Sequence, residues 1–224
     1  MRPPFPPSGP PMILHDYWRS SAAFRVRIAL ALKGIEPGRR YVHLRKGEQR
    51  APGHLAKHPL GLVPVLEDGA TTLTQSLAIL EYLEETHPKP PLLPAKPDER
   101  AWVRAVALAV ACEIHPLNNL RVLRYLEREL RADEAARDRW YAHWVAEGLG
   151  AIEKMLAERP GPGPFCLGAT PTIADACLVP QVFNAWRFEV PMEPYPLVRA
   201  VVETCLALPA FEQSRPERQP DAEP

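Results

Sequence analysis

The chain has 224 residues, with 27 basic and 27 acidic side chains, so its formal net charge is zero. This length is enough for one large or two small domains with a buried core. The balanced charge argues against a nucleic-acid-binding protein and gives no reason to expect binding to an anionic membrane. Proline is abundant, at 28 of 224 residues against a usual share of about 5%. The hydrophobic fraction of 46% nevertheless indicates a folded chain.

The four cysteines form no C-x-x-C pair, and the seven histidines show no metal-binding spacing. We therefore expect no metal site and no disulfide framework, which favours a reducing, cytoplasmic setting. Residues 1–11 contain six prolines and lack the apolar stretch of a secretory signal, so we expect a disordered tail there. The sequence contains no run of about 18 apolar residues, so we expect no membrane-spanning helix.

Residues 12–93 alternate between strand and helix patterns. Their order predicts a strand, a helix and a strand, then a long connection with one possible helical turn, then two strands and a helix. Asp68-Gly69 is a strong hairpin signal between the last two strands. The elements are expected at 12–17, 22–33, 39–44, 64–67, 71–73 and 75–86, with Gly34 ending the first helix.

Residues 94–224 show only helical patterns after a proline-rich joint at 88–97. Asp98 is expected to cap a long helix that Pro116 kinks, because proline removes a helical hydrogen bond. Asp133 is expected to cap the next helix. Thr172-Ile-Ala-Asp175 resembles a capping box that opens a buried helix at 174–182, and a last helix is expected at 196–208. The sequence thus predicts an α/β domain at 12–93 and an all-helical domain at 94–224.

Two polar pairs stand at strand-to-helix junctions, where free backbone N–H groups and the helix dipole favour an anion. These pairs are Ser20-Ser21 and Gln75-Ser76. A lone serine at such a place is more often an ordinary N-cap. Nearby arginines favour anion binding at the first pair without deciding it.

Seven segments together resemble the zeta-class glutathione transferases, in order and with similar spacing over residues 12–221. The segments are Ser20–Gly34, Gly61–Val65, Gln75–Glu85, Ile114–Leu120, Ala174–Val182, Asn184–Phe188 and Arg218–Asp221. The resemblance implies a thioredoxin-like N-terminal domain, a helical C-terminal domain and glutathione bound between them. It also implies a homodimer.

The resemblance further implies which residues bind glutathione. Ser20 and Ser21 would face its sulfur, Gln75 and Ser76 would hold the γ-glutamyl carboxylate, and the backbone of Val63, before a cis-Pro64, would pair with the cysteinyl unit. The full expected glutathione set is Ser20, Ser21, Ala22, Ala23, Phe24, Arg25, Gln49, Val63, Pro64, Gln75, Ser76, His115, Asn119, Leu120 and Arg121.

The activity that the resemblance implies is glutathione-dependent cis-trans isomerisation of maleylacetoacetate to fumarylacetoacetate, with Ser20, Ser21, His115 and Arg187 as catalytic residues. Arg187 would meet a substrate carboxylate, although an isolated arginine is more often part of a surface ion pair. We expect arginines 19, 25, 27, 121 and 187 to gather around a small maleyl dicarboxylate. Ala22 stands where the family often has cysteine, which excludes a protein thiol at that position.

Three alternatives remain open from the sequence. The chain could isomerise maleylpyruvate by the same chemistry, or it could act as a transferase or dehalogenase on small α-halo acids. It could also be a glutathione-binding module without activity, for which Ala22 is the best argument.

Overall fold

A computed structural model describes residues 12–223, and the segment 1–11, expected to be a disordered tail, lies outside them. Its N-terminal half holds a four-stranded mixed sheet in the order β2-β1-β3-β4. Strand β1 runs parallel to β2 and antiparallel to β3, which forms a hairpin with β4. The strands are β1 (Ile13–Asp16), β2 (Gly38–Tyr41), β3 (Val65–Asp68) and β4 (Thr71–Thr74).

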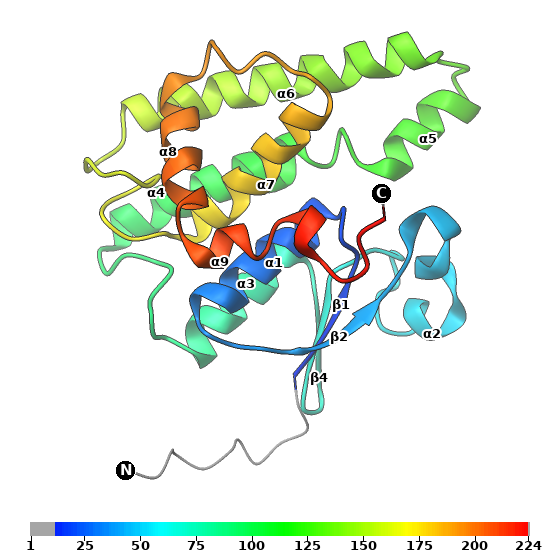
Figure 1. Cartoon of the computed structure of the whole chain (residues 1–224), viewed down its shortest axis with the longest axis horizontal. Coiled ribbons are helices and arrows are strands. Elements are labelled where there is room, and N and C mark those ends of the chain that lie inside the picture. The colour runs from blue at the N-terminus through cyan, green and yellow to red at the C-terminus, as the bar shows by residue number, and fades with distance from the viewer. Residues whose placement is uncertain (1–11, 224) are drawn as a thin grey trace.

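Helices α1 (Ser21–Leu32) and α3 (Ser76–Thr86) pack beside each other against this sheet (Figure 1). Gly34 follows α1 with a φ of 67°, a left-handed conformation that glycine adopts without steric cost. The connection after β2 holds two short 3₁₀ turns, η1 (Leu44–Lys46) and η2 (Glu48–Arg50), and the short helix α2 (Pro52–Leu55). The expected order of strands and helices is confirmed.

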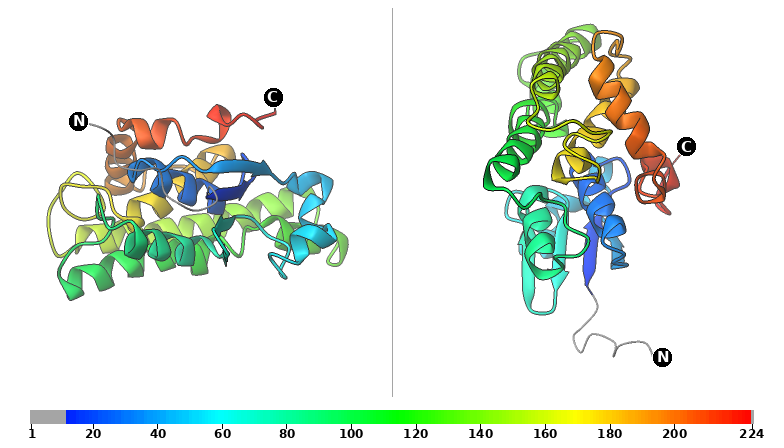
Figure 2. Two further views of the ribbon diagram at one scale, coloured as in Figure 1. Left: turned by 90° about the horizontal axis from the view of Figure 1, so that it is seen from below. Right: turned by 90° about the vertical axis from the view of Figure 1, so that its left-hand side faces the viewer.

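The second half is helical and packs onto the first through α7, which lies against α1 (Figure 2). Its elements are α4 (Pro97–Leu108), η3 (Ala109–Ile114), α5 (Leu120–Arg128), α6 (Glu134–Ala157), α7 (Ile173–Arg187), α8 (Pro196–Leu206), α9 (Pro209–Glu212) and η4 (Pro216–Arg218). A thioredoxin-like half followed by a helical half is the expected fold class. The expected boundary between residues 93 and 94 stays a prediction.

Two helices begin at the capping residues that the sequence predicts. Asp133 caps α6 by accepting the Ala136 N–H at 2.7 Å. Thr172 and Asp175 form a complete capping box at α7, with Asp175 accepting the Thr172 N–H at 2.7 Å. Because these interactions join residues three apart, they can be read from a short stretch of sequence.

The expected helix through Pro116 is wrong in two respects. Asp98 is not the cap, because Pro97 occupies the first helical position, where its missing N–H has no cost. The chain does not continue as a kinked helix through Pro116 either; it widens into the single π-helical turn η3 and leaves the helix at His115. The following helix α5 has no counterpart in the sequence-based expectation, and α7 runs beyond the expected 174–182 at both ends.

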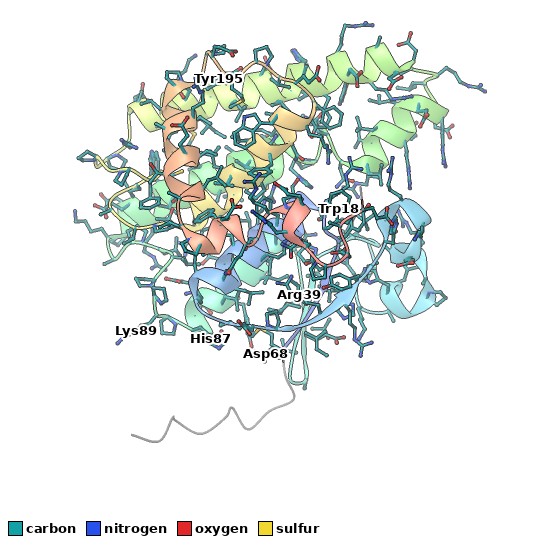
Figure 3. The ribbon with its side chains drawn as sticks, in the orientation of Figure 1. Trp18, Arg39, Asp68, His87, Lys89 and Tyr195 are labelled. Atoms are coloured by element: carbon teal, nitrogen blue, oxygen red, sulfur yellow. The ribbon has the colours of Figure 1, made fainter. Side chains whose placement is uncertain are left out.

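A buried ion pair joins strand β1 of the sheet to helix α1. Arg27 Nη1 lies 2.7 Å from Asp16 Oδ1, and both side chains are at most 1% exposed. The same guanidinium donates to the carbonyls of Trp18 and Ser214, each at 3.1 Å. Arg39 Nη1 reaches the other oxygen of Asp16 at 2.7 Å, and Figure 3 labels Arg39 and Trp18. One side chain of α1 thus holds β1, the loop before α1 and the C-terminal segment together.

We expect Asp16→Asn to lower the free energy of unfolding by about 3 kcal/mol or more, because Arg27 would stay buried without its counter-charge. Urea denaturation followed by circular dichroism measures the change. The matched control is Glu81→Gln, which removes a half-exposed partner of Arg104 and is expected to cost about 1 kcal/mol or less. Equal losses in the two variants would contradict the role given to the buried pair.

Candidate active site

A cleft of about 580 Å³ opens between the sheet half and the helical half. Its walls come from the β1–α1 loop, the segment after α2, the start of α3, the turn η3, the start of α5 and the end of α7. In Figure 1, α5 and α2 lie at the same end of the molecule, one in each half. The expected residues that line it are Ser20, Ser21, Ala22, Arg25, Val63, Pro64, Gln75, Ser76, His115, Asn119, Leu120, Arg121 and Arg187.

The two serines stand at the N-terminus of α1 with different hydrogen bonds. Ser20 is the N-cap, and its Oγ accepts the Ala23 N–H at 3.2 Å. Ser21 Oγ accepts a hydrogen bond of 2.7 Å from the Asn184 side-chain amide on α7. Since each oxygen already accepts a hydrogen bond, each hydroxyl proton remains free to donate to an anion in the cleft.

The start of α3 forms a second polar corner of the cleft. Gln75 has a φ of 68° and a ψ of 116°, a rarely populated backbone conformation that costs a non-glycine residue about 1–3 kcal/mol, and such strain concentrates at functional sites. Ser76 Oγ accepts a 3.1 Å hydrogen bond from Arg25 Nη1. The peptide bond between Val63 and Pro64, at the neighbouring edge of the cleft, is cis as expected.

Arg25 is a buried cation with too few partners. Its side chain belongs to a residue only 2% exposed, and its Nε and Nη2 atoms have no hydrogen-bond partner within residues 12–223. Burial lowers the pKa of this guanidinium, and no carboxylate offsets the effect. A buried positive charge without a counter-ion is costly, so this corner of the cleft favours an anionic ligand group.

His115 directly follows the π-helical turn, and its backbone N–H donates to the carbonyl of Val110 at 3.0 Å. Burial lowers the pKa of this histidine to about 3, with further lowering by the charges of Arg25 and Arg121. The imidazole is therefore neutral at physiological pH. As a neutral group it can take part in hydrogen bonds in the cleft but supplies no positive charge.

Arg187 reaches the cleft from the last turn of α7. Burial in the surrounding protein lowers its pKa, although part of the side chain is open to the cleft. Its charged neighbours include no carboxylate: the pKa is influenced by Tyr141, Arg19 and Tyr17. The surface ion pair considered as the simpler explanation of Arg187 is therefore not what the structure shows. Tyr141 stacks on Phe188, with ring centroids 3.6 Å apart, and the Arg187 guanidinium carbon lies 4.9 Å from the centre of the Phe188 ring.

The cleft walls are rich in positive charge and contain no Asp or Glu among the described residues. The arginines that line it are Arg19, Arg25, Arg45, Arg121 and Arg187. Arg27, expected in this group, is instead part of the buried ion pair with Asp16. Positions 25 and 27 differ by about 200° around a helix, so the two side chains face opposite ways.

Three further expected residues are not brought into the cleft. Gln49 is buried and donates to the Leu44 carbonyl at 3.2 Å, so it supports the loop after β2. Ala23 is fully buried inside α1. Phe24 packs edge-on against Phe183 and lines a smaller, neighbouring pocket of about 260 Å³.

The cleft also contains residues that the sequence-based site lacked. They are Tyr17, Arg45, Cys112, Asn118, Tyr141 and Asn184, among others. Asn184 was present in a motif segment, three residues before Arg187, which places both on one face of a helix. That spacing was the available signal. Cys112 is an exposed free cysteine.

Two functional classes find no support in the described part of the chain. Within residues 12–223, no group of three or more His, Cys, Asp or Glu side chains is arranged to hold a metal ion. No helix of that part is both long and apolar enough to pass through a membrane.

Comparison with known proteins identifies the family. Residues 10–85 match the N-terminal domain of glutathione S-transferases, and residues 134–204 match their C-terminal domain. The chain therefore belongs to the glutathione S-transferase family. Within it, one similar solved structure is a holo form of maleyl pyruvate isomerase, a bacterial member of the zeta class, with 48% identity and a TM-score of 0.92. That alignment covers 94% of this chain and 100% of the other.

Two other similar proteins carry the name maleylacetoacetate isomerase. A probable maleylacetoacetate isomerase of Vibrio cholerae is 47% identical, over 94% of this chain and 98% of its own. The enzyme of Anaeromyxobacter dehalogenans, solved with dicarboxyethyl glutathione and citrate in its active site, is 44% identical with a TM-score of 0.84. That alignment covers 96% of this chain and 99% of the other.

We expect the neutral state of His115 to make folding depend on pH. The pKa is about 3 in the folded protein and near 6.5 when unfolded, so below pH 6.5 the unfolded state binds the extra proton. Stability should fall as the pH drops toward 3, with about 1.5 kcal/mol lost between pH 6.5 and 5 from this group alone. Urea denaturation of the wild type and of His115→Gln isolates this contribution; identical pH dependences would contradict it.

Proposed function

We propose that the protein is a glutathione-dependent cis-trans isomerase that converts maleylacetoacetate to fumarylacetoacetate. The observation that carries this proposal is the cleft itself: within residues 12–223, five arginines and no carboxylate surround two serine hydroxyls at a helix N-terminus. Glutathione and a maleyl dicarboxylate together bring four carboxylates. A site with this charge pattern suits both molecules at once.

In this proposal glutathione occupies the side of the cleft formed by the sheet half. Its γ-glutamyl carboxylate meets Gln75 and Ser76 at the start of α3, with Arg25 supplying the charge behind Ser76. The backbone of Val63 pairs with the cysteinyl unit. Asn119, Leu120 and Arg121 line the opposite wall. The two buried guanidinium nitrogens of Arg25 that lack partners support this placement, because an adjacent carboxylate compensates their charge.

Ser20 and Ser21 activate the thiol by donating hydrogen bonds to its sulfur. A thiol with a pKa near 8.5 is only about 3% ionised at pH 7, and lowering that pKa to about 7 requires roughly 2 kcal/mol. A charge-assisted hydrogen bond and the N-terminus of α1 together supply an amount of this size. No protein thiol is needed at Ala22.

The reaction then proceeds by reversible addition. The thiolate sulfur forms a bond to one carbon of the cis double bond, and the π electron pair moves onto the conjugated carbonyl as an enolate. The former double bond is now single and rotates. When the enolate collapses, the carbon–sulfur bond breaks, the trans double bond forms and the thiolate is restored, so glutathione is not consumed.

Arg187 and His115 stabilise the charge that develops on the substrate. Arg187 provides the positive charge for a substrate carboxylate or the enolate oxygen. The neutral His115 donates a hydrogen bond without adding a charge. The ligand bound in the Anaeromyxobacter enzyme supports this chemistry, because dicarboxyethyl glutathione is a thioether of glutathione with a four-carbon diacid.

Maleylpyruvate isomerisation is the second candidate, favoured by the similarity to a maleyl pyruvate isomerase. Both substrates present a cis double bond flanked by carbonyl and carboxylate groups, so the same residues would act.

We further propose a cytoplasmic homodimer. The exposed Cys112 fits a reducing compartment, and the dimer follows family expectation.

The activity is tested by following the ultraviolet absorbance of each maleyl substrate with and without glutathione. We expect turnover only with glutathione, and a loss of about a hundredfold in kcat/KM for Ser21→Ala, because a preorganised donor to the sulfur is removed. Ser20→Ala should also lose activity, with an added loss of about 1 kcal/mol in stability from the missing cap.

Isomerisation without added glutathione would overturn the mechanism, and full activity in both serine variants would overturn their role. A chain that binds glutathione but turns over no maleyl or halo acid would be a binding module instead. A chain that turns over only halo acids would be a transferase.

Two arginine variants should separate the two halves of the site. We expect Arg25→Met to weaken glutathione binding by about tenfold to a hundredfold while leaving the unliganded protein as stable or more stable, because an unpaired buried cation is removed. Arg187→Met should raise KM and lower kcat for the maleyl substrate, because the guanidinium binds a substrate carboxylate and stabilises the developing charge, with little change in glutathione affinity. Calorimetry and initial rates measure both; the opposite pattern would contradict the proposed arrangement.

A further inference from the structure

The side chain of Asn184 connects helix α7 to the serine pair. Its amide Nδ2 lies 2.7 Å from Ser21 Oγ and donates the hydrogen bond. It is the only side-chain hydrogen bond to Ser21 among the described residues, whereas the bond to Ser20 comes from the backbone of Ala23. Ser21 is 8% exposed, so few other groups can compete for its hydroxyl.

The direction of this hydrogen bond determines what Ser21 can do. A hydroxyl has one proton, and an oxygen that accepts from an amide directs that proton elsewhere. The open side of Ser21 is the cleft, whose wall it forms. With Asn184 as donor, the Ser21 hydroxyl can donate to a thiolate; with an acceptor in that position, the proton would turn toward α7 and away from the cleft.

The packing of α7 on α1 keeps the side chains of Asn184 and Ser21 close together. Asn184 and Ser21 both line the main cleft and the smaller pocket, so they form part of the wall between these cavities. Behind that wall, Phe183 packs edge-on against Phe24 of α1, with ring centroids 5.4 Å apart. Phe183 also contacts Trp186 at 5.0 Å. The contact between Phe183 and Phe24 packs α7 against α1 and helps to set the distance from Asn184 to Ser21.

We propose that Asn184 is a positioning residue that orients the Ser21 hydroxyl so that its proton is donated to the sulfur of bound glutathione. This inference rests on the proposed glutathione-dependent activity. Asn184 precedes Arg187 by one helical turn, so a single helix face directs one side chain at the thiol-activating serine and the other at the substrate. In this role Asn184 acts through the Ser21 hydroxyl rather than on the sulfur or the substrate itself.

The test is the pKa of the glutathione thiol bound to the protein, obtained from the ultraviolet absorbance of its thiolate as the pH is raised. We expect Asn184→Ala to raise this pKa by about one unit, which is a tenfold loss of thiolate below the pKa. Asn184→Asp should raise it further, because a carboxylate accepts the Ser21 proton and adds a negative charge. The decrease in kcat/KM at low pH should follow the thiolate fraction.

Three comparisons isolate the orientation effect. In the Ser21→Ala background, Asn184→Ala should cause no further pKa shift, and Asn184→Asp should cause only the smaller shift due to its charge. Gln181→Ala removes another side-chain amide of α7, one that has no hydrogen-bond partner within residues 12–223 and does not line the cleft, and should leave the thiol pKa at its wild-type value.

A wild-type thiol pKa in Asn184→Asp would overturn the proposal, as would shifts of equal size with and without Ser21. Neither result would affect the proposed function, because the wild type would still show a bound thiolate and turnover. Absence of a bound thiolate in the wild type would overturn the proposed function, and this inference with it.

Discussion

The ion pair between Arg27 and Asp16 is the interaction on which the site depends. It stands at the junction of three segments that are far apart in the sequence: strand β1, the loop that leads into α1, and the C-terminal segment. In that loop the Trp18 carbonyl accepts a hydrogen bond from Arg27. The Trp18 N–H donates to the carboxylate of Asp221 at 3.0 Å. The serine pair begins two residues after Trp18, so its position depends on these hydrogen bonds.

Helix α1 also carries a second buried arginine, Arg25, whose hydrogen-bond partners differ from those of Arg27. Arg27 has a carboxylate and several carbonyls around it, which compensate its burial. Arg25, two positions earlier, has one hydroxyl contact and no carboxylate. The first arrangement stabilises the fold without any ligand, whereas the second leaves a charge that only an incoming anion can compensate. Helix α1 thus separates structural and binding charge onto its two sides.

These distinctions set the limit of what could be predicted from the sequence. The capping box of Thr172 and Asp175 could be predicted because it is a contact between residues close in sequence. The end of α1 at Gly34 could be predicted because a left-handed residue, usually glycine, often follows a helix. Arg25 and Arg27 could not be told apart, since both faces of α1 are buried and only the tertiary neighbours differ. The π-helical turn before His115 has no sequence signal, and Pro116 suggested a kink one residue beyond the place where the helix ends.

The contact between Asn184 and Ser21 shows the same limit at the site itself. The resemblance placed both residues in motif segments, yet only folding brings α7 against α1 and reveals which amide faces which hydroxyl. The neutral net charge likewise concealed a cleft whose walls, among the described residues, hold five arginines and no carboxylate. Lys33 shows the opposite arrangement, because its ammonium lies 2.8 Å from the Glu84 carboxylate. Since the arginines of the cleft gather in one hollow that carries no negative side chain, recognition of glutathione and a dicarboxylate depends on local imbalance rather than on overall charge.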